Sequence, residues 1–68
     1  MNAVTAEYLM GIKDARAQYK MHGLSIAHDE LDNLNRTIKG FSASSPVGQM
    51  LRGERDFWKN QINKSLVD

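Results

Sequence analysis

Apolar side chains recur every three or four positions through the first third of the chain, which is the spacing of one face of an α-helix. The positions of this first apolar stripe are Tyr8, Ile12, Ala15 and Tyr19. Thr5 is the expected N-cap, because its hydroxyl can accept a free N–H of the first turn. Gly23 is the expected end, since glycine readily adopts the positive φ that closes many helices. The pattern therefore predicts a helix over residues 6–22, in which Gly11 marks a close helix crossing.

A second apolar stripe with the same spacing follows. It consists of Ala27, Leu31, Leu34, Ile38 and Phe41. Ser25 is the expected N-cap and Gly40 the expected end, for the same reasons of side-chain capping and backbone freedom. These signals predict a second helix over residues 26–39.

The dipeptide Ser45-Pro46 marks the start of a third helix. A residue before proline is excluded from the helical conformation, as an N-cap must be, and proline suits the first helical position. The apolar set that follows is Val47, Met50, Leu51, Phe57, Trp58 and Ile62. We expect a helix over residues 46–64, followed by a frayed tail at residues 65–68.

Three amphipathic helices with short links can cover one another's apolar stripes. No segment alternates apolar and polar side chains with period two, so no strand is predicted. We therefore expect an all-α fold, either a small three-helix bundle or an open three-helix array. No internal repeat or second domain is evident, and residues 1–68 are expected to form a single helical domain.

Composition and charge narrow the class of protein. A core built from 68 residues leaves only about 3–5 kcal/mol of stability, so self-association or a protein partner is a plausible supplement. The 9 basic and 8 acidic residues give a net charge of +1, which excludes a polybasic nucleic-acid tail and an acidic DNA mimic. The apolar runs are short and no signal-peptide pattern is present, so we expect a cytoplasmic protein without membrane contact.

The sequence contains no recognisable constellation for catalysis or for binding a metal. The absence of cysteine excludes thiolate ligands and thiol nucleophiles. His22 and His28 lack a ligand spacing, and no Ser/His/Asp arrangement is present. Gly48 and Gly53 fall inside the predicted third helix and cannot form a phosphate-binding loop. We expect no enzymatic activity, no cofactor and no metal.

Glu54 falls within the apolar face of the third helix, close to one line with Leu51 and Trp58. A buried carboxylate without a partner is costly. One interpretation places Glu54 at the edge of the fold, paired with a basic side chain or accepting a hydrogen bond from the Tyr8 or Tyr19 hydroxyl. The other places it on a surface that meets a partner.

A neighbouring face of the third helix is basic. It carries Arg52, Arg55, Lys59 and Asn63 at i, i+3, i+7 and i+11. Arginines at such spacing can contact phosphates or guanine edges, as in a recognition helix. Asp56 interrupts the basic run, and a plain solvated face is the alternative interpretation.

Phe57 and Trp58 are adjacent, so both rings are not expected to point into one small core. Either both are nevertheless packed inside, or one lies at the rim and contacts a partner. An exposed tryptophan beside arginines is the usual composition of a protein–protein hot spot.

The segment SSPVGQMLRGERDFWKNQ, with ELDNLNRTIKGF before it, resembles small uncharacterised accessory proteins of bacteriophages and prophages of enteric bacteria. The resemblance covers the C-terminal half of the chain. It implies a protein made in the cytoplasm of a bacterial host cell, where such proteins bind a host protein or regulate phage genes. It assigns no role to any residue.

Two functions are expected from these observations. The first is a non-enzymatic protein-interaction module that binds and modulates a bacterial host protein, or binds a second copy of itself. Its surface would be the third helix, through Phe57 or Trp58, with Glu54, Arg52, Arg55 and Lys59 around them. The alternative is a small DNA-binding transcriptional regulator that uses Arg52, Arg55, Lys59 and Asn63.

Overall fold

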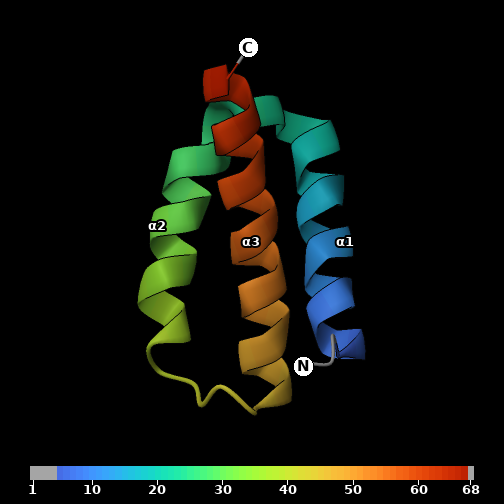
Figure 1. Cartoon of the computed structure of the whole chain (residues 1–68), viewed down its shortest axis with the longest axis vertical. Helices are drawn as coiled ribbons and strands as arrows, with labels where there is room; N and C mark the ends of the chain where they lie inside the picture. Colours follow the sequence, from blue (N-terminus) through green and yellow to red (C-terminus); the bar gives the residue numbers. More distant parts are fainter. Residues whose placement is uncertain (1–4, 68) are drawn as a thin grey trace.

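The computed structural model describes residues 5–67, and its fold is all-α, as predicted (Figure 1). The elements are α1 (Ala6–His22), the 3-10 helix η1 (Gly23–Ile26), α2 (Ala27–Ile38) and α3 (Pro46–Val67). The described residues contain no strand. The third helix continues beyond Lys64, where the sequence predicted its end.

Three of the predicted helix boundaries are made by the expected residues. The Thr5 hydroxyl accepts a hydrogen bond from the Tyr8 N–H at 3.1 Å, which caps α1. Gly23 ends α1 with a φ of +66° and donates its N–H to the Tyr19 carbonyl. The Ser45 hydroxyl accepts the Gly48 N–H at 2.8 Å, at the start of α3.

The junction between α1 and α2 differs from the prediction. Ser25 does not cap α2, because residues 23–26 form η1 and carry the helical backbone from α1 directly into α2. The Ser25 hydroxyl instead donates to the His22 carbonyl at 2.8 Å, one turn back. The first two helices are therefore joined by a helical bend and not by an open loop.

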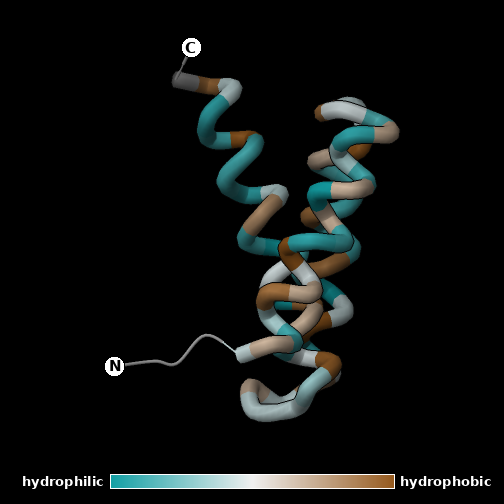
Figure 2. The backbone as a smooth tube through the Cα atoms, turned by 90° about the vertical axis from the view of Figure 1, so that its right-hand side faces the viewer, coloured by the Kyte–Doolittle hydropathy of each residue, from teal (hydrophilic) through white to brown (hydrophobic). Residues whose placement is uncertain are grey.

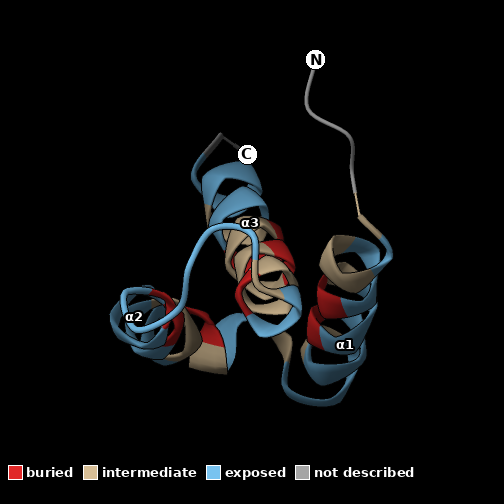
Figure 3. Ribbon diagram, turned by 90° about the horizontal axis from the view of Figure 1, so that it is seen from below, coloured by how far each residue is buried: buried red, intermediate tan, exposed pale blue. Residues whose placement is uncertain are grey.

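The arrangement is not a strict three-helix bundle. The helical segment 6–38 folds back on itself at η1, and α3 lies between its two arms (Figure 1). Both α1 and α2 pack against α3, whereas they make almost no contact with each other. The buried residues of each helix face inward, toward the neighbouring helices (Figure 3). As a result, α3 has packing partners on two sides, and α1 and α2 have a partner on one.

The core is small and is centred on α3. Its buried apolar residues are Ala15, Ala27, Leu34, Ile38, Phe57 and Trp58. The rings of Phe57 and Trp58 meet edge to face with centroids 5.7 Å apart, and Tyr19 contacts both at 5.9 and 6.2 Å. Edge-to-face aromatic pairs contribute about 0.5–1.5 kcal/mol beyond their burial. This aromatic cluster joins α1 to α3.

Two glycines bring α1 and α3 into backbone contact. A Cβ on Gly11 would overlap the Met50 carbonyl oxygen, and a Cβ on Gly53 would overlap the Tyr8 carbonyl oxygen. No other residue type fits at either position without separating the helices. The predicted close crossing at Gly11 is confirmed, and α3 contributes a glycine of its own to it.

Candidate functional site

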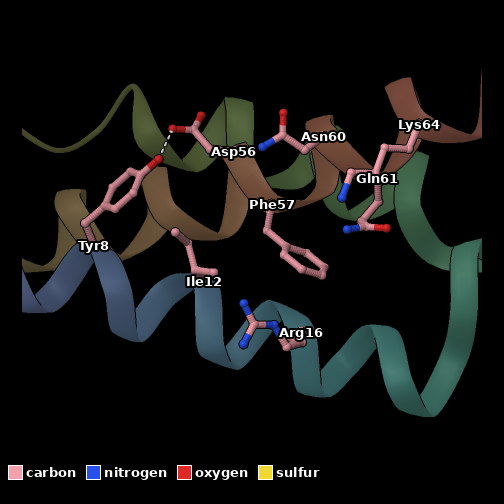
Figure 4. A pocket seen from close by; sticks show the side chains of 8 residues that line it. All are labelled: Tyr8, Ile12, Arg16, Asp56, Phe57, Asn60, Gln61 and Lys64. Carbon is pink, nitrogen blue, oxygen red and sulfur yellow. Dashed lines mark hydrogen bonds between the residues drawn. The ribbon is translucent and has the colours of Figure 1, made fainter. Parts of the chain in front are cut away.

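The candidate site is a groove between α1 and α3, which run in the same direction (Figure 1). The helices meet at Gly11 and Gly53, and the C-terminal part of α3 then leads away from the rest of the fold (Figure 2). The separation leaves a hollow of about 340 Å³ between them. The residues that line it are Tyr8, Ile12, Arg16, Asp56, Phe57, Asn60, Gln61 and Lys64 (Figure 4). We call it the α1–α3 groove.

A hydrogen-bonded pair closes the end of the groove nearest the helix crossing. The Tyr8 hydroxyl donates to Asp56 Oδ2 at 2.5 Å, and Arg55 Nη2 lies 3.0 Å from Asp56 Oδ1. The hydrogen bond to Asp56 raises the pKa of Tyr8, and partial burial and the carboxylate charge add to this effect. The Asp56 charge is therefore already compensated by a hydroxyl and a guanidinium.

The floor of the groove is apolar and its walls carry two cations. Ile12 is half-buried, and the buried Phe57 ring points from α3 toward α1 (Figure 4). Arg16 on α1 and Lys64 on α3 are exposed and line the groove from opposite sides. Neither makes an ion pair or a side-chain hydrogen bond within the described part of the chain. The groove thus combines an apolar floor with uncompensated positive charge.

A second hollow continues the groove toward η1. It measures about 260 Å³ and is lined by Tyr19, Leu24, Gln61, Lys64 and Ser65. Gln61 and Lys64 border both hollows. Leu24 is 39% exposed there and offers an apolar side chain at the far end. The two hollows together follow the contact between α1 and α3 from Tyr8 to Leu24.

The predicted aromatic anchors are not exposed. Trp58 is 1% and Phe57 9% exposed, so both rings belong to the core. The interpretation that places one ring at the rim is wrong for this structure. Because α3 is covered on two sides, it buries an arc wide enough for two successive side chains. Only the edge of Phe57 at the groove floor remains available to a ligand.

The predicted basic face does not form a uniform row of free cations. Lys59 and Asn63 are exposed, whereas Arg52 and Arg55 are half-buried. Arg55 is engaged by Asp56, and Arg52 Nε is buried without a hydrogen-bond partner among the described residues. The two residues expected to contact DNA most directly are therefore the least available of the set.

Glu54 is half-buried and lies on the side of α3 that faces both arms of the helical segment. It makes no ion pair or hydrogen bond with residues 5–66, and the Tyr8 hydroxyl binds Asp56 instead. Burial raises the pKa of Glu54, and the charges of Asp14 on α1 and Glu30 on α2 raise it further. The interpretation of a paired carboxylate is wrong, and the partner-surface interpretation stays a prediction.

Most groove residues were missed by the sequence interpretation. Tyr8, Ile12 and Arg16 follow one another at intervals of four along α1, as do Asp56, Asn60 and Lys64 along α3. Each set forms the edge of a helix face. The spacing alone does not reveal that these two edges lie opposite each other.

Comparison with protein-family models, with curated proteins and with solved structures finds no match to this chain. The described helices contain none that combines the length and hydropathy needed to cross a membrane. Within residues 5–66, no group of three histidine, aspartate or glutamate side chains is placed to hold a metal ion. The described residues that line the groove include no serine or histidine.

Proposed function

We propose that this protein is a non-enzymatic protein-interaction module. The observation that carries the proposal is the amount of apolar surface that the fold leaves uncovered. The large apolar side chains that stand exposed are Leu9, Met10, Met21, Leu24, Phe41, Val47 and Leu66. They outnumber the buried core residues, of which two are alanines. Large exposed apolar side chains supply the area that a binding partner would bury.

The uncovered surface follows from the arrangement of the helices. We propose that the chain works as an open three-helix array, in which α1 and α2 share α3 but do not close on each other. The end of α3 carries Leu66, which is 78% exposed and has no core to join. A partner protein or a second copy would remove this surface from water and add to a small stability.

The binding surface we propose differs from the one that the sequence suggested. Phe57 and Trp58 are needed for the core, so the partner contacts the α1–α3 groove and the apolar side chains around it. The cellular role that we propose rests on the resemblance of the sequence to phage and prophage accessory proteins. In that role the protein would bind and modulate a host protein in the bacterial cytoplasm.

The DNA-binding alternative has less support. Asp56 neutralises Arg55 in the middle of the proposed contact face, and Arg52 is half-buried. Lys59 remains as the one exposed cation of this face, beside the neutral Asn63, and one cation is too few for the phosphate contacts that sustain DNA affinity at physiological salt. No feature of the fold favours this function over protein binding.

The experiment that tests the proposal is affinity capture from an enteric bacterial lysate, with and without nuclease, followed by reconstitution with the purified candidate. The variant Met21→Glu/Leu24→Glu places charge on two exposed apolar positions at the α1–η1 end. The matched control Gln18→Glu/Asn35→Glu adds the same charge at exposed polar positions. Light scattering on the purified chain gives its oligomeric state.

We expect a protein complex or a homo-oligomer that survives nuclease, weakens at least tenfold in the apolar variant and persists in the control. A strictly monomeric chain that captures no protein contradicts the proposal. Binding that disappears with nuclease or in Arg52→Ala supports the DNA alternative instead.

A further inference from the structure

We propose that the α1–α3 groove recognises an acidic segment of a partner protein, in which a carboxylate side chain is flanked by apolar residues. This inference deepens the proposed function and rests on it. The groove lies between helices whose crossing is fixed by two glycines, so its walls are held in place before a partner arrives. It therefore has the pre-organised character of a peptide-binding site.

The charge of the groove selects an anion. Arg16 and Lys64 face the space between the helices from opposite walls, and neither is paired within residues 5–66. Asp56, the one acidic lining residue, is already bonded to Tyr8 and Arg55. An incoming carboxylate would meet two free cations with the amides of Asn60 and Gln61 beside them. Such charge-assisted hydrogen bonds are stronger than neutral ones.

The apolar parts of the groove select a ligand with apolar side chains on both sides of its carboxylate. Ile12 and Phe57 form an apolar floor on one side of Gln61 and Lys64, and Tyr19 and Leu24 line the hollow on the other. A ligand that fits this order carries an apolar side chain, then a carboxylate, then another apolar side chain. An amphipathic helix with acidic residues has this pattern along one face, and helices of partners commonly dock in grooves of this kind.

Nucleic acid fits the same groove poorly. Single strands bind through a continuous basic path and through aromatic faces on which bases stack. Here the cations are two, Asp56 stands at one end, and the Phe57 ring is enclosed by Tyr19 and Trp58. Phe57 is 9% and Trp58 1% exposed, so neither ring offers a face for stacking. The combination of an apolar floor and isolated cations favours a protein segment.

The test uses the full chain labelled with ¹⁵N and three synthetic peptides that differ only in charge. The peptides are Ac-LEELLEEL-NH₂, Ac-LQQLLQQL-NH₂ and Ac-LKKLLKKL-NH₂. We expect the acidic peptide to shift the amide signals of Ile12, Arg16, Phe57, Gln61 and Lys64. Its affinity should exceed that of the glutamine peptide by about tenfold, as two rim charge contacts allow. The lysine peptide should not bind the groove.

Two variants with the same change of net charge complete the test. Arg16→Glu/Lys64→Glu reverses the charge of the groove. This variant should bind the acidic peptide at least tenfold more weakly and should bind the basic peptide. Lys13→Glu/Lys39→Glu changes exposed lysines outside the groove and should keep the original preference. The ¹⁵N spectrum of each variant shows directly that it is folded.

Each outcome decides the inference. Shifts confined to other residues, or equal binding of the acidic and glutamine peptides, overturn the acidic specificity. If the lysate experiment still yields a partner in that case, the proposed interaction function stands and only its chemistry was wrong. A chain that binds no peptide and captures no protein refutes both. A short single strand of DNA that shifts the same amides more strongly than the acidic peptide also overturns the inference.

Discussion

The hydroxyl of Tyr8 and the carboxylate of Asp56 join the start of α1 to the middle of α3 through a hydrogen bond of 2.5 Å. The two residues are 48 positions apart in the chain. Their bond lies beside the glycine contact between the helices, and Arg55 holds the second carboxylate oxygen. Tyr8 and Asp56 thus meet at the register that the glycine contact sets for the two helices, and their bond stabilises that register.

Removal of the Tyr8 hydroxyl should destabilise the fold modestly. We expect Tyr8→Phe to lower the free energy of unfolding by about 1 kcal/mol, because the lost hydrogen bond has a charged acceptor but is partly exposed. The measurement is urea unfolding followed by circular dichroism. Tyr19→Phe is the matched control, since the Tyr19 ring packs in the core but its hydroxyl has no bond within the described residues. An equal loss in both variants would contradict a specific role for the Tyr8 bond.

The same hydrogen bond should make stability depend on alkaline pH. The pKa of Tyr8 is raised above its ordinary value of 10.0, chiefly by the bond to Asp56. A group whose pKa is higher in the folded state stabilises the fold fully below its unfolded pKa and loses this effect as pH rises through the folded pKa. The stabilities of the wild type and Tyr8→Phe should therefore converge above pH 10, which unfolding midpoints measured from pH 8 upward would show. A constant difference would contradict the prediction.

The close contact between the backbones of α1 and α3 should leave no room for a side chain at Gly11 or Gly53. We expect either Gly→Ala substitution to cost about 2–4 kcal/mol, because overpacking at backbone atoms outweighs the gain in helix propensity. Urea unfolding measures the loss. Gly40→Ala is the control, since its Cβ would meet only the Thr37 carbonyl oxygen at 3.5 Å. A neutral or stabilising Gly11→Ala would show that α1 and α3 do not touch at this point.

Glu54 should destabilise the fold at neutral pH. Its pKa is raised by burial and by Asp14 and Glu30, so the folded state holds the Glu54 proton more tightly than the unfolded chain does. Stability then falls as pH rises from the ordinary glutamate value through the raised one. We expect Glu54→Gln to raise Tm at pH 7 by about 2–4 °C and to change it little at pH 4. Asp32→Asn, at an exposed position of α2, is the control and should have little effect at either pH.

Trp58 should be required for folding and not directly for binding. Truncation of a buried tryptophan to alanine costs about 3–5 kcal/mol, which equals the whole stability expected of a domain of this size. We expect Trp58→Ala to lose its helical circular dichroism, whereas Trp58→Phe remains folded with reduced stability. Leu66→Ala, at a position 78% exposed, should be neutral to within about 0.5 kcal/mol. A fully folded Trp58→Ala that only loses a partner would restore the exposed-anchor interpretation.

Sequence periodicity was sufficient to predict where the helices lie, but it did not predict how α1 is joined to α2 or which helices pack together. The caps at Thr5 and Ser45 were predictable because a capping bond is local to a few residues. Ser25 was misassigned because the sequence of a 3-10 bend resembles a break followed by a new cap. The two cases differ in whether the backbone stays helical between the two helices, and the local side chains do not determine this.

The candidate site depends on contacts that are distant in the sequence. The sequence left open whether Phe57 and Trp58 are both buried, because the answer depends on whether α3 has partners on two sides. The meeting of Tyr8 with Asp56 depends on the register of two helices, which the glycines set and the apolar pattern leaves open. Charge patterning did reveal Arg52, Arg55 and Lys59, but it did not show that Arg55 has a neighbouring carboxylate as its partner.

The parallel pairing of α1 with α3 has a consequence for the order of events during synthesis. The helix α3 is synthesised after α1 and α2, and both earlier helices pack against α3 while they hardly touch each other. A nascent chain that ends before Met50 has neither the aromatic cluster nor the glycine contact. Closing a loop of about forty residues must precede the contacts between α1 and α3, which is slow for a helical protein. The helices α1 and α2 are therefore expected to become stable only after α3 has been synthesised through Trp58, and capture of a partner in the groove requires α3.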